Sequence, residues 1–173
     1  MKRPLILTVT CLLLGFLSLS AQAAQICSSS IPYTSPDDHF TINKDGTAAD
    51  KTTGLMWMRC SLGQTWNGRS CSGEAQSFSW AEGLKAAAGY PFAGHSDWRL
   101  PNKNELESIV ENRCYSPAIN TRIFPDTPAA YFWTSSPYAG AATGAWSVDF
   151  GYGPVNASVK AGKVLVRLVR DLE

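Results

Sequence analysis

The sequence has few of the residues and motifs that enzymes use at their active sites. It contains two histidines, His39 and His95, and neither a glycine-rich phosphate loop nor a His-Glu-x-x-His motif, so the usual nucleotide and zinc-protease sites are excluded. Ser96 and Asp97 follow His95, but consecutive residues rarely form a catalytic triad, whose members converge from separate parts of a fold. We therefore expect a protein that is not an enzyme and needs no cofactor.

The chain also lacks an excess of charge of either sign. Its 15 Lys and Arg residues nearly balance 14 Asp and Glu residues, so net charge gives no reason to expect binding to nucleic acid or anionic membranes. Four basic residues lie close together near the C-terminus: Lys160, Lys163, Arg167 and Arg170. They form either a small patch for a polyanion such as a sulfated glycan or, as we favour, solvated turn lysines and buried, paired arginines.

Long apolar runs are missing except at the N-terminus. Basic residues at 2–3 precede an apolar stretch over about 5–19, and Ala21-Gln22-Ala23 follows. This order is typical of a secretory signal peptide over residues 1–23, and the run is short for a membrane span of about 20 residues. We expect an exported protein, periplasmic or extracellular, that keeps no membrane span after cleavage and has length for one domain with a real core.

Four cysteines follow the predicted cleavage site: Cys27, Cys60, Cys71 and Cys114. An even number in an exported protein is typical of two disulfides. Among the three connectivities we favour Cys60–Cys71, which closes a short polar loop, and Cys27–Cys114, which ties the N-terminal segment to the end of the second predicted helix. A zinc site is the alternative, but no Cys-x-x-Cys pair is present and export disfavours it, so no metal is expected.

The distribution of apolar and turn residues predicts an α+β fold. An irregular segment at 24–37 precedes a domain at 38–173, in which two helices accompany a small antiparallel sheet or meander. Period-two alternation marks several of the strands. The predicted strands are residues 40–42, 55–59, 131–134, 146–150, 155–159 and 164–170, the last mostly buried, and the predicted helices are residues 80–89 and 103–112.

The second helix has the clearest start signal. Pro101 disfavours helical geometry at Leu100, and Asn102 can then cap a helix with Glu105 completing a capping box. We expect Arg99 to form a structural ion pair, because its long stem can pack while its head reaches a carboxylate.

These segments together resemble the Lcl C-terminal domain family, an exported bacterial domain without an assigned function. The resemblance covers roughly residues 38–172 and implies a variant of the C-type lectin-like fold. The Trp-Arg-Leu-Pro element at 98–101 is also similar to the formylglycine-generating and sulfatase-modifying group, but the late cysteine chemistry of that group has no counterpart here after Cys114. The matching segments are Thr53–Trp57, Asp97–Asn102 with Glu105-Leu106, Ile119-Asn120 before Phe124-Pro125, Phe132–Ser136 and Val166–Arg170.

The family takes its name from the tip of a collagen-like adhesin, and this chain has no Gly-X-Y stalk. We therefore expect a free-standing, non-catalytic binding domain that recognises a glycan or a protein at the bacterial cell surface, with self-association left open. A structural subunit of an envelope or appendage assembly is the first alternative, and an enzyme with an unrecognised site is the second.

Ligand contact is expected from the loops at 61–78 and 138–156. Exposed aromatic rings can stack on sugars, and polar side chains can complete such a site. Calcium-dependent sugar binding is not expected, because no Glu-Pro-Asn or Gln-Pro-Asp sequence is present and Asp149 is predicted to be a solvated strand residue. The candidate ligand-binding residues are Trp66, Tyr138, Tyr152, Asn156, Lys160 and Lys163.

Overall fold

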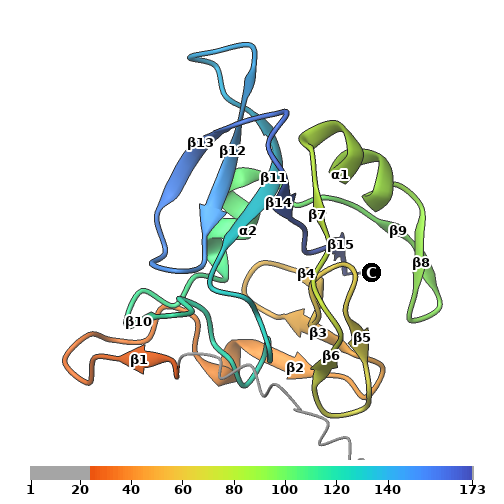
Figure 1. The fold of residues 1–173 in the computed structure, drawn as a ribbon. Coiled ribbons are helices and arrows are strands. Elements are labelled where there is room, and N and C mark those ends of the chain that lie inside the picture. The colour runs from red at the N-terminus through yellow and green to blue at the C-terminus, as the bar shows by residue number, and fades with distance from the viewer. Residues whose placement is uncertain (1–23, 173) are drawn as a thin grey trace, which may run out of the picture.

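Two antiparallel-rich sheets form the frame of the domain (Figure 1). The structure is a computed structural model that describes residues 24–172; the predicted signal peptide lies outside the described residues. The larger sheet has the order β13-β12-β11-β14-β7, and the smaller has the order β15-β4-β3-β2. Their strands are β13 (Val155–Val159), β12 (Gly144–Asp149), β11 (Tyr131–Pro137), β14 (Val164–Leu165), β7 (Ser77–Phe78), β15 (Val169–Asp171), β4 (Leu55–Met58), β3 (Thr47–Asp50) and β2 (Phe40–Ile42).

Three two-stranded pairs lie outside these sheets. Because each pair has strands of only two to four residues, none could be recognised from periodicity. The pairs are β1 (Ile26–Cys27) with β10 (Cys114–Tyr115), β5 (Thr65–Trp66) with β6 (Cys71–Ser72), and β8 (Tyr90–Phe92) with β9 (His95–Trp98), and a short 3-10 helix, η1, covers Asp37–His39.

Two helices cover opposite faces of the larger sheet. Phe132 and Val148 share one face and pack in the cluster that contains Leu106 of α2 (Lys103–Ser108). Trp133 and Ala145 lie in the second cluster, against which residues of α1 (Trp80–Ala87) pack. Because successive side chains of a strand point to opposite faces of the sheet, each helix packs against a different cluster of buried residues.

The predicted helix starts are confirmed. The Asn102 side chain accepts from Glu105 N at 3.0 Å, and the Glu105 carboxylate accepts from Asn102 N at 2.7 Å. Arg99 forms the expected ion pair, with Glu105 at 2.8 Å. The predicted end of this helix is wrong, because the helix stops at Ser108 and Val110 pairs instead with Ile119 in an isolated antiparallel bridge.

The last predicted strand is two strands in different sheets. β14 runs parallel to β11, whereas β15 runs antiparallel to β4. Arg167 lies between them, fully buried, and donates to the carbonyl oxygens of Met58 and Arg59 and to Thr127 Oγ1. The chain crosses between the sheets here because these acceptors hold the guanidinium inside the protein.

Two predictions of side-chain exposure near the C-terminus are also wrong. Asp149 is buried, with 8% exposure, because its carboxylate accepts from Gly151 N at 2.7 Å in the turn that follows β12. Period-two alternation over residues 155–159 predicts that Val155, Ala157 and Val159 face the core, but Val159 is 63% exposed. Ser158 is half-buried and its hydroxyl lies 2.8 Å from that of buried Ser147.

Candidate binding site

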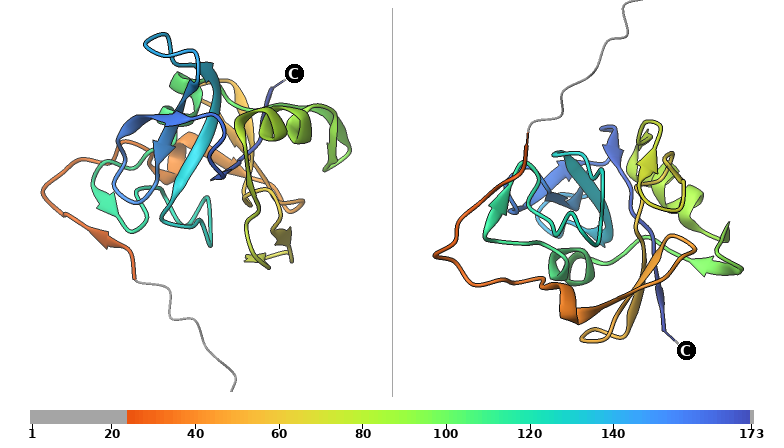
Figure 2. Two further views of the ribbon diagram at one scale, coloured as in Figure 1. Left: turned by 45° about the horizontal axis from the view of Figure 1, so that its top comes forward. Right: turned by 90° about the horizontal axis from the view of Figure 1, so that it is seen from below.

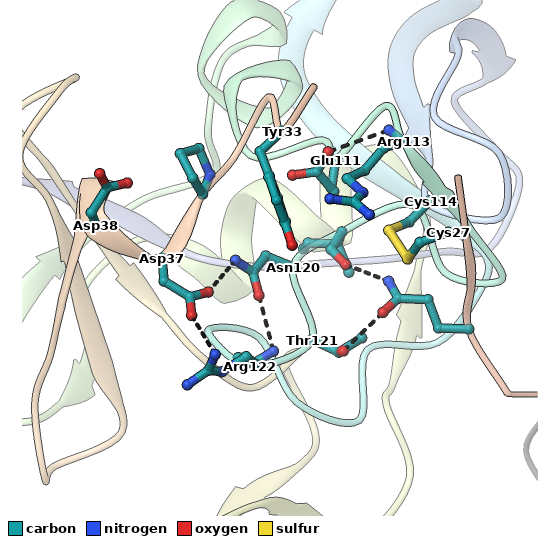
Figure 3. A pocket seen from close by; sticks show the side chains of 13 residues that line it. Cys27, Tyr33, Asp37, Asp38, Glu111, Arg113, Cys114, Asn120, Thr121 and Arg122 are labelled. Atoms are coloured by element: carbon teal, nitrogen blue, oxygen red, sulfur yellow. Dashed lines mark hydrogen bonds and ion pairs between the residues drawn. A yellow bond between two sulfur atoms is a disulfide. The ribbon is translucent and has the colours of Figure 1, made fainter. Parts of the chain in front are cut away.

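A cavity of about 550 Å³ opens between the N-terminal segment and the loop at residues 111–122 (Figure 3). We call residues 24–38 the N-terminal strap. The strap forms an outer arc beside the rest of the domain (Figure 2). The cavity is lined by Gln25, Cys27, Tyr33, Pro36, Asp37, Asp38, Glu111, Arg113, Cys114, Ile119, Asn120, Thr121 and Arg122.

The disulfide Cys27–Cys114 attaches the strap at one end of the cavity, and Cys60–Cys71 closes the β5–β6 hairpin elsewhere. Both are the pairs that the sequence favours. The Gln25 side chain adds donations to the carbonyl oxygens of Pro117 and Ile119, at 2.7 and 2.6 Å. The start of the strap is thus held by one covalent bond and by hydrogen bonds to the loop it faces.

A buried carboxylate anchors the middle of the strap. Glu111 is only 2% exposed. Its Oε1 accepts from Thr34 N at 3.2 Å and from Arg113 N at 3.3 Å, and its Oε2 accepts from Ser35 N at 3.0 Å. Hydrogen bonds to an ionised acceptor are stronger than neutral ones, so Glu111 fixes the strap against the loop while its own charge is satisfied.

One wall of the cavity presents an aromatic ring and a cation. The guanidinium carbon of Arg113 lies 4.0 Å from the centre of the Tyr33 ring, a geometry in which the ring quadrupole attracts the cation. Tyr33 is 63% exposed, and Arg113 Nε is buried without a hydrogen-bond partner among the described residues. Because Nε is covered, the contact surface that this part of the lining offers is chiefly the exposed Tyr33 ring.

Another part of the lining consists of polar side chains that form hydrogen bonds and an ion pair with one another. The Asn120 amide donates to Ser35 O at 2.9 Å and to Asp37 Oδ1 at 2.8 Å, and Arg122 pairs with Asp37 at 2.8 Å. Asp38 is exposed beside this group. The walls together offer an aromatic surface, cationic donors and carboxylate acceptors, which suit a polar ligand held by hydrogen bonds and ring stacking.

The strongly perturbed ionisable groups lie elsewhere and have structural roles. Burial, with a smaller effect of the nearby Arg59 charge, lowers the pKa of Arg167 to about 9. The hydrogen bond from Arg170 lowers the pKa of Asp97. Within residues 24–172, no group of three His, Cys, Asp or Glu side chains is placed to hold a metal ion.

Three of the residues predicted to contact ligand are engaged in intramolecular contacts. Trp66 donates its indole N–H to Lys44 O at 3.0 Å, which folds the β5–β6 hairpin onto the turn before β3. Tyr138 packs edge-on against Trp146, with ring centroids 4.9 Å apart. Asn156 donates to Pro154 O at 3.2 Å.

The two predicted lysines lie near the start of α1. Lys160 Nζ donates to Ala142 O at 2.8 Å and lies 4.5 Å from the centre of the Trp80 ring. Lys163 forms an ion pair with Glu82. Each amine therefore has a partner within the fold, and Lys160 is half-buried rather than fully solvated.

Tyr152 is 73% exposed and stacks on Tyr115, with ring centroids 6.2 Å apart. Because Tyr115 follows Cys114, this pair of rings lies next to the disulfide that lines the cavity. The structure does not gather the six predicted residues into one site, and their contact with a ligand stays a prediction. The cavity residues of the strap had one sequence signal, the predicted Cys27–Cys114 bond, which brings residues 24–38 to the loop.

The fold defines a class of small, mostly β domain with two helices and two disulfides, here with an open cavity at one end. Residues 46–170 match the Lcl C-terminal domain family, and the chain belongs to that family. No curated protein matches the chain. Over the described part of the chain, no helix has both the length and the apolar character needed to cross a membrane.

Proposed function

We propose that this protein is an exported, non-catalytic binding domain of C-type lectin-like type, which recognises a glycan or a protein at the bacterial cell surface. The observation that carries the proposal is the cavity beneath the strap. Glu111, Asn120 and Gln25 stabilise its lining, while the Tyr33 ring is 63% exposed and the half-buried Arg113 lies against it. A preformed cavity with a few placed polar groups is typical of ligand recognition.

A glycan is the ligand class that the cavity suits best. Sugar rings bury apolar C–H faces against aromatic side chains and direct hydroxyl groups to carboxylates and guanidinium groups. Tyr33 supplies the ring, and Arg113 and Asp38 supply a donor and an acceptor at the same opening. The two disulfides support export, because such bonds persist in oxidising compartments.

The absence of catalysis is supported by the placement of the ionisable groups. Active sites usually hold carboxylates or histidines with shifted pKa values inside a cleft. Here Glu82 and Asp97 have lowered pKa values because they pair with Lys163 and Arg170, and none of these four residues lines the cavity.

A glycan array and a pull-down with the purified protein test the proposal. We expect at least one reproducible ligand, and we expect Tyr33→Ala to weaken its binding tenfold or more, about 1.4 kcal/mol. Tyr131→Ala is the matched control, because Tyr131 is also exposed, at 44%, and does not line the cavity. Failure of both screens, or equal binding by Tyr33→Ala and the wild type, would count against this site.

A further inference from the structure

The outer edge of the larger sheet is formed by β13, the longest edge strand among the described residues (Figure 1). Asp149 N donates to Pro154 O, and Lys160 N donates to Thr143 O. Even-numbered residues of this strand therefore direct their backbone groups toward β12. Because backbone groups alternate in direction along a strand, the N–H and C=O groups of Val155, Ala157 and Val159 point away from β12. The Val159 carbonyl already accepts from Gly162 N at 2.8 Å in the following turn, so the edge offers the Val155 and Ala157 groups and the Val159 N–H.

Within its five residues this edge has no charge, proline or β-bulge to prevent strands from pairing, although Pro154 precedes it and Lys160 follows it. Natural edges are protected by charged residues, proline or β-bulges. The sequence of β13 is Val-Asn-Ala-Ser-Val, without charge or proline, and its pairing with β12 has no register shift. The nearest cation, Lys160, is directed toward Ala142 O and the Trp80 ring.

We propose that β13 is the contact surface for a second copy of this chain, which pairs antiparallel with it about a two-fold axis at Ala157. The strand sequence Val-Asn-Ala-Ser-Val has apolar, polar, apolar, polar and apolar residues, so the two sides of Ala157 match in polarity. In this register Val155 faces Val159 of the second copy, Asn156 faces Ser158, and Ala157 faces its own counterpart. The contact is isologous, as in most homodimers.

The backbone supports the same register. In this register Ala157 exchanges two hydrogen bonds with its counterpart, and the Val159 N–H of each copy donates to the Val155 C=O of the other. The Val159 C=O stays with Gly162 N of its own chain. The pairing would join two five-stranded sheets into one continuous sheet. It would also place the exposed side chains of Ala157 and Val159 beside those of the second copy on one face.

The contact is independent of the cavity, because no residue of β13 lines it. A dimer would nevertheless carry two cavities, and two linked sites bind a surface with many ligands more tightly than one site does. The contact area of a single strand is below that of a standard stable interface, so we expect a dimer that dissociates on dilution.

Sedimentation velocity over a wide range of protein concentration tests this inference through charges placed on the axis. Ala157 is exposed in the single chain, so Ala157→Lys and Ala157→Glu should both fold, as circular dichroism can verify. Each variant alone would face its own charge across the axis and should be monomeric. An equimolar mixture should form a heterodimer, because opposite charges then face each other.

Ala88→Lys is the matched control, because Ala88 is an exposed alanine at the end of α1, and it should dimerise like the wild type. A wild-type protein that stays monomeric at every concentration would overturn the inference. Dimers of Ala157→Lys alone, or a mixture of the two variants that stays monomeric, would overturn it too, because association would not then depend on this register.

Discussion

The substitution Glu111→Gln tests whether one buried carboxylate holds the strap in place. The carboxylate accepts Ser35 N at one oxygen and Thr34 N at the other. Glutamine keeps one acceptor oxygen and places an amino group at the other position, where it meets a backbone N–H without accepting it. Loss of a hydrogen bond to a charged acceptor costs about 2–3 kcal/mol, so local opening of the strap should increase roughly 30- to 150-fold.

Hydrogen exchange followed by mass spectrometry measures this opening directly. Peptides that contain Thr34 and Ser35 should exchange faster in Glu111→Gln, whereas peptides from the core strand β12 should not, because the Cys27–Cys114 bond keeps the strap attached and the domain folded. Glu107→Gln removes an equal charge from an exposed side chain that pairs with Lys103, and serves as the control. Unchanged exchange in Glu111→Gln would refute the anchoring role.

Three further predictions concern stability. Removing the Cys27–Cys114 bond, whose residues are 87 apart in sequence, should lower the unfolding free energy in urea by up to about 4.6 kcal/mol on the chain-entropy model. Leu106→Ala, at a fully buried side chain, should lower it by roughly 2–5 kcal/mol. The hydrogen bond from Lys163 is the largest of the contacts that lower the pKa of Glu82 from 4.5 to about 2. As the pH falls, the Glu82 carboxylate therefore takes up a proton in the unfolded state before it does so in the folded state. Its contribution to the unfolding free energy is full above pH 4.5 and is lost as the pH falls toward 2. Glu82→Gln should therefore reduce the dependence of the unfolding free energy on pH between 4.5 and 2.

Each of these predictions has a control in the same chain. The Cys60–Cys71 bond joins residues 11 apart, so its removal should cost less, about 3 kcal/mol; a larger loss than for Cys27–Cys114 would contradict the entropic account. Leu84→Ala, at a half-buried position, should cost less than the core substitution. Glu74→Gln, at an exposed carboxylate, should leave the acid slope unchanged.

Local signals predicted the parts of the fold that local interactions determine. Asn102 and Glu105 form their reciprocal hydrogen bonds within one turn of chain, so the start of α2 could be read from four residues. The bond between Cys60 and Cys71 also spans a short stretch. In such cases the sequence contains both partners side by side, and no knowledge of the remaining fold is needed.

Features that depend on distant segments could not be read in the same way. The apolar run at 164–170 has the composition of one strand, yet Arg167 finds its acceptors on Met58, Arg59 and Thr127, and the run is divided between two sheets. β13 has clear alternation of apolar and polar residues. Which of its two faces is buried, however, depends on what packs against the sheet at that strand. Periodicity shows that the two faces of a strand differ in polarity, but it does not identify which element of the fold packs against either face.

The cavity shows the same dependence most clearly, because its lining residues come from two segments that are far apart in sequence. Tyr33 and Asp37 belong to the strap, whereas Arg113 and Arg122 belong to the loop that follows α2. The family match begins at residue 46, so the strap lies outside it. The matched region can supply the sheets and the lining residues at 111–122, but the remaining lining residues belong to the strap. The ligand preference of this chain should therefore follow the sequence of its strap.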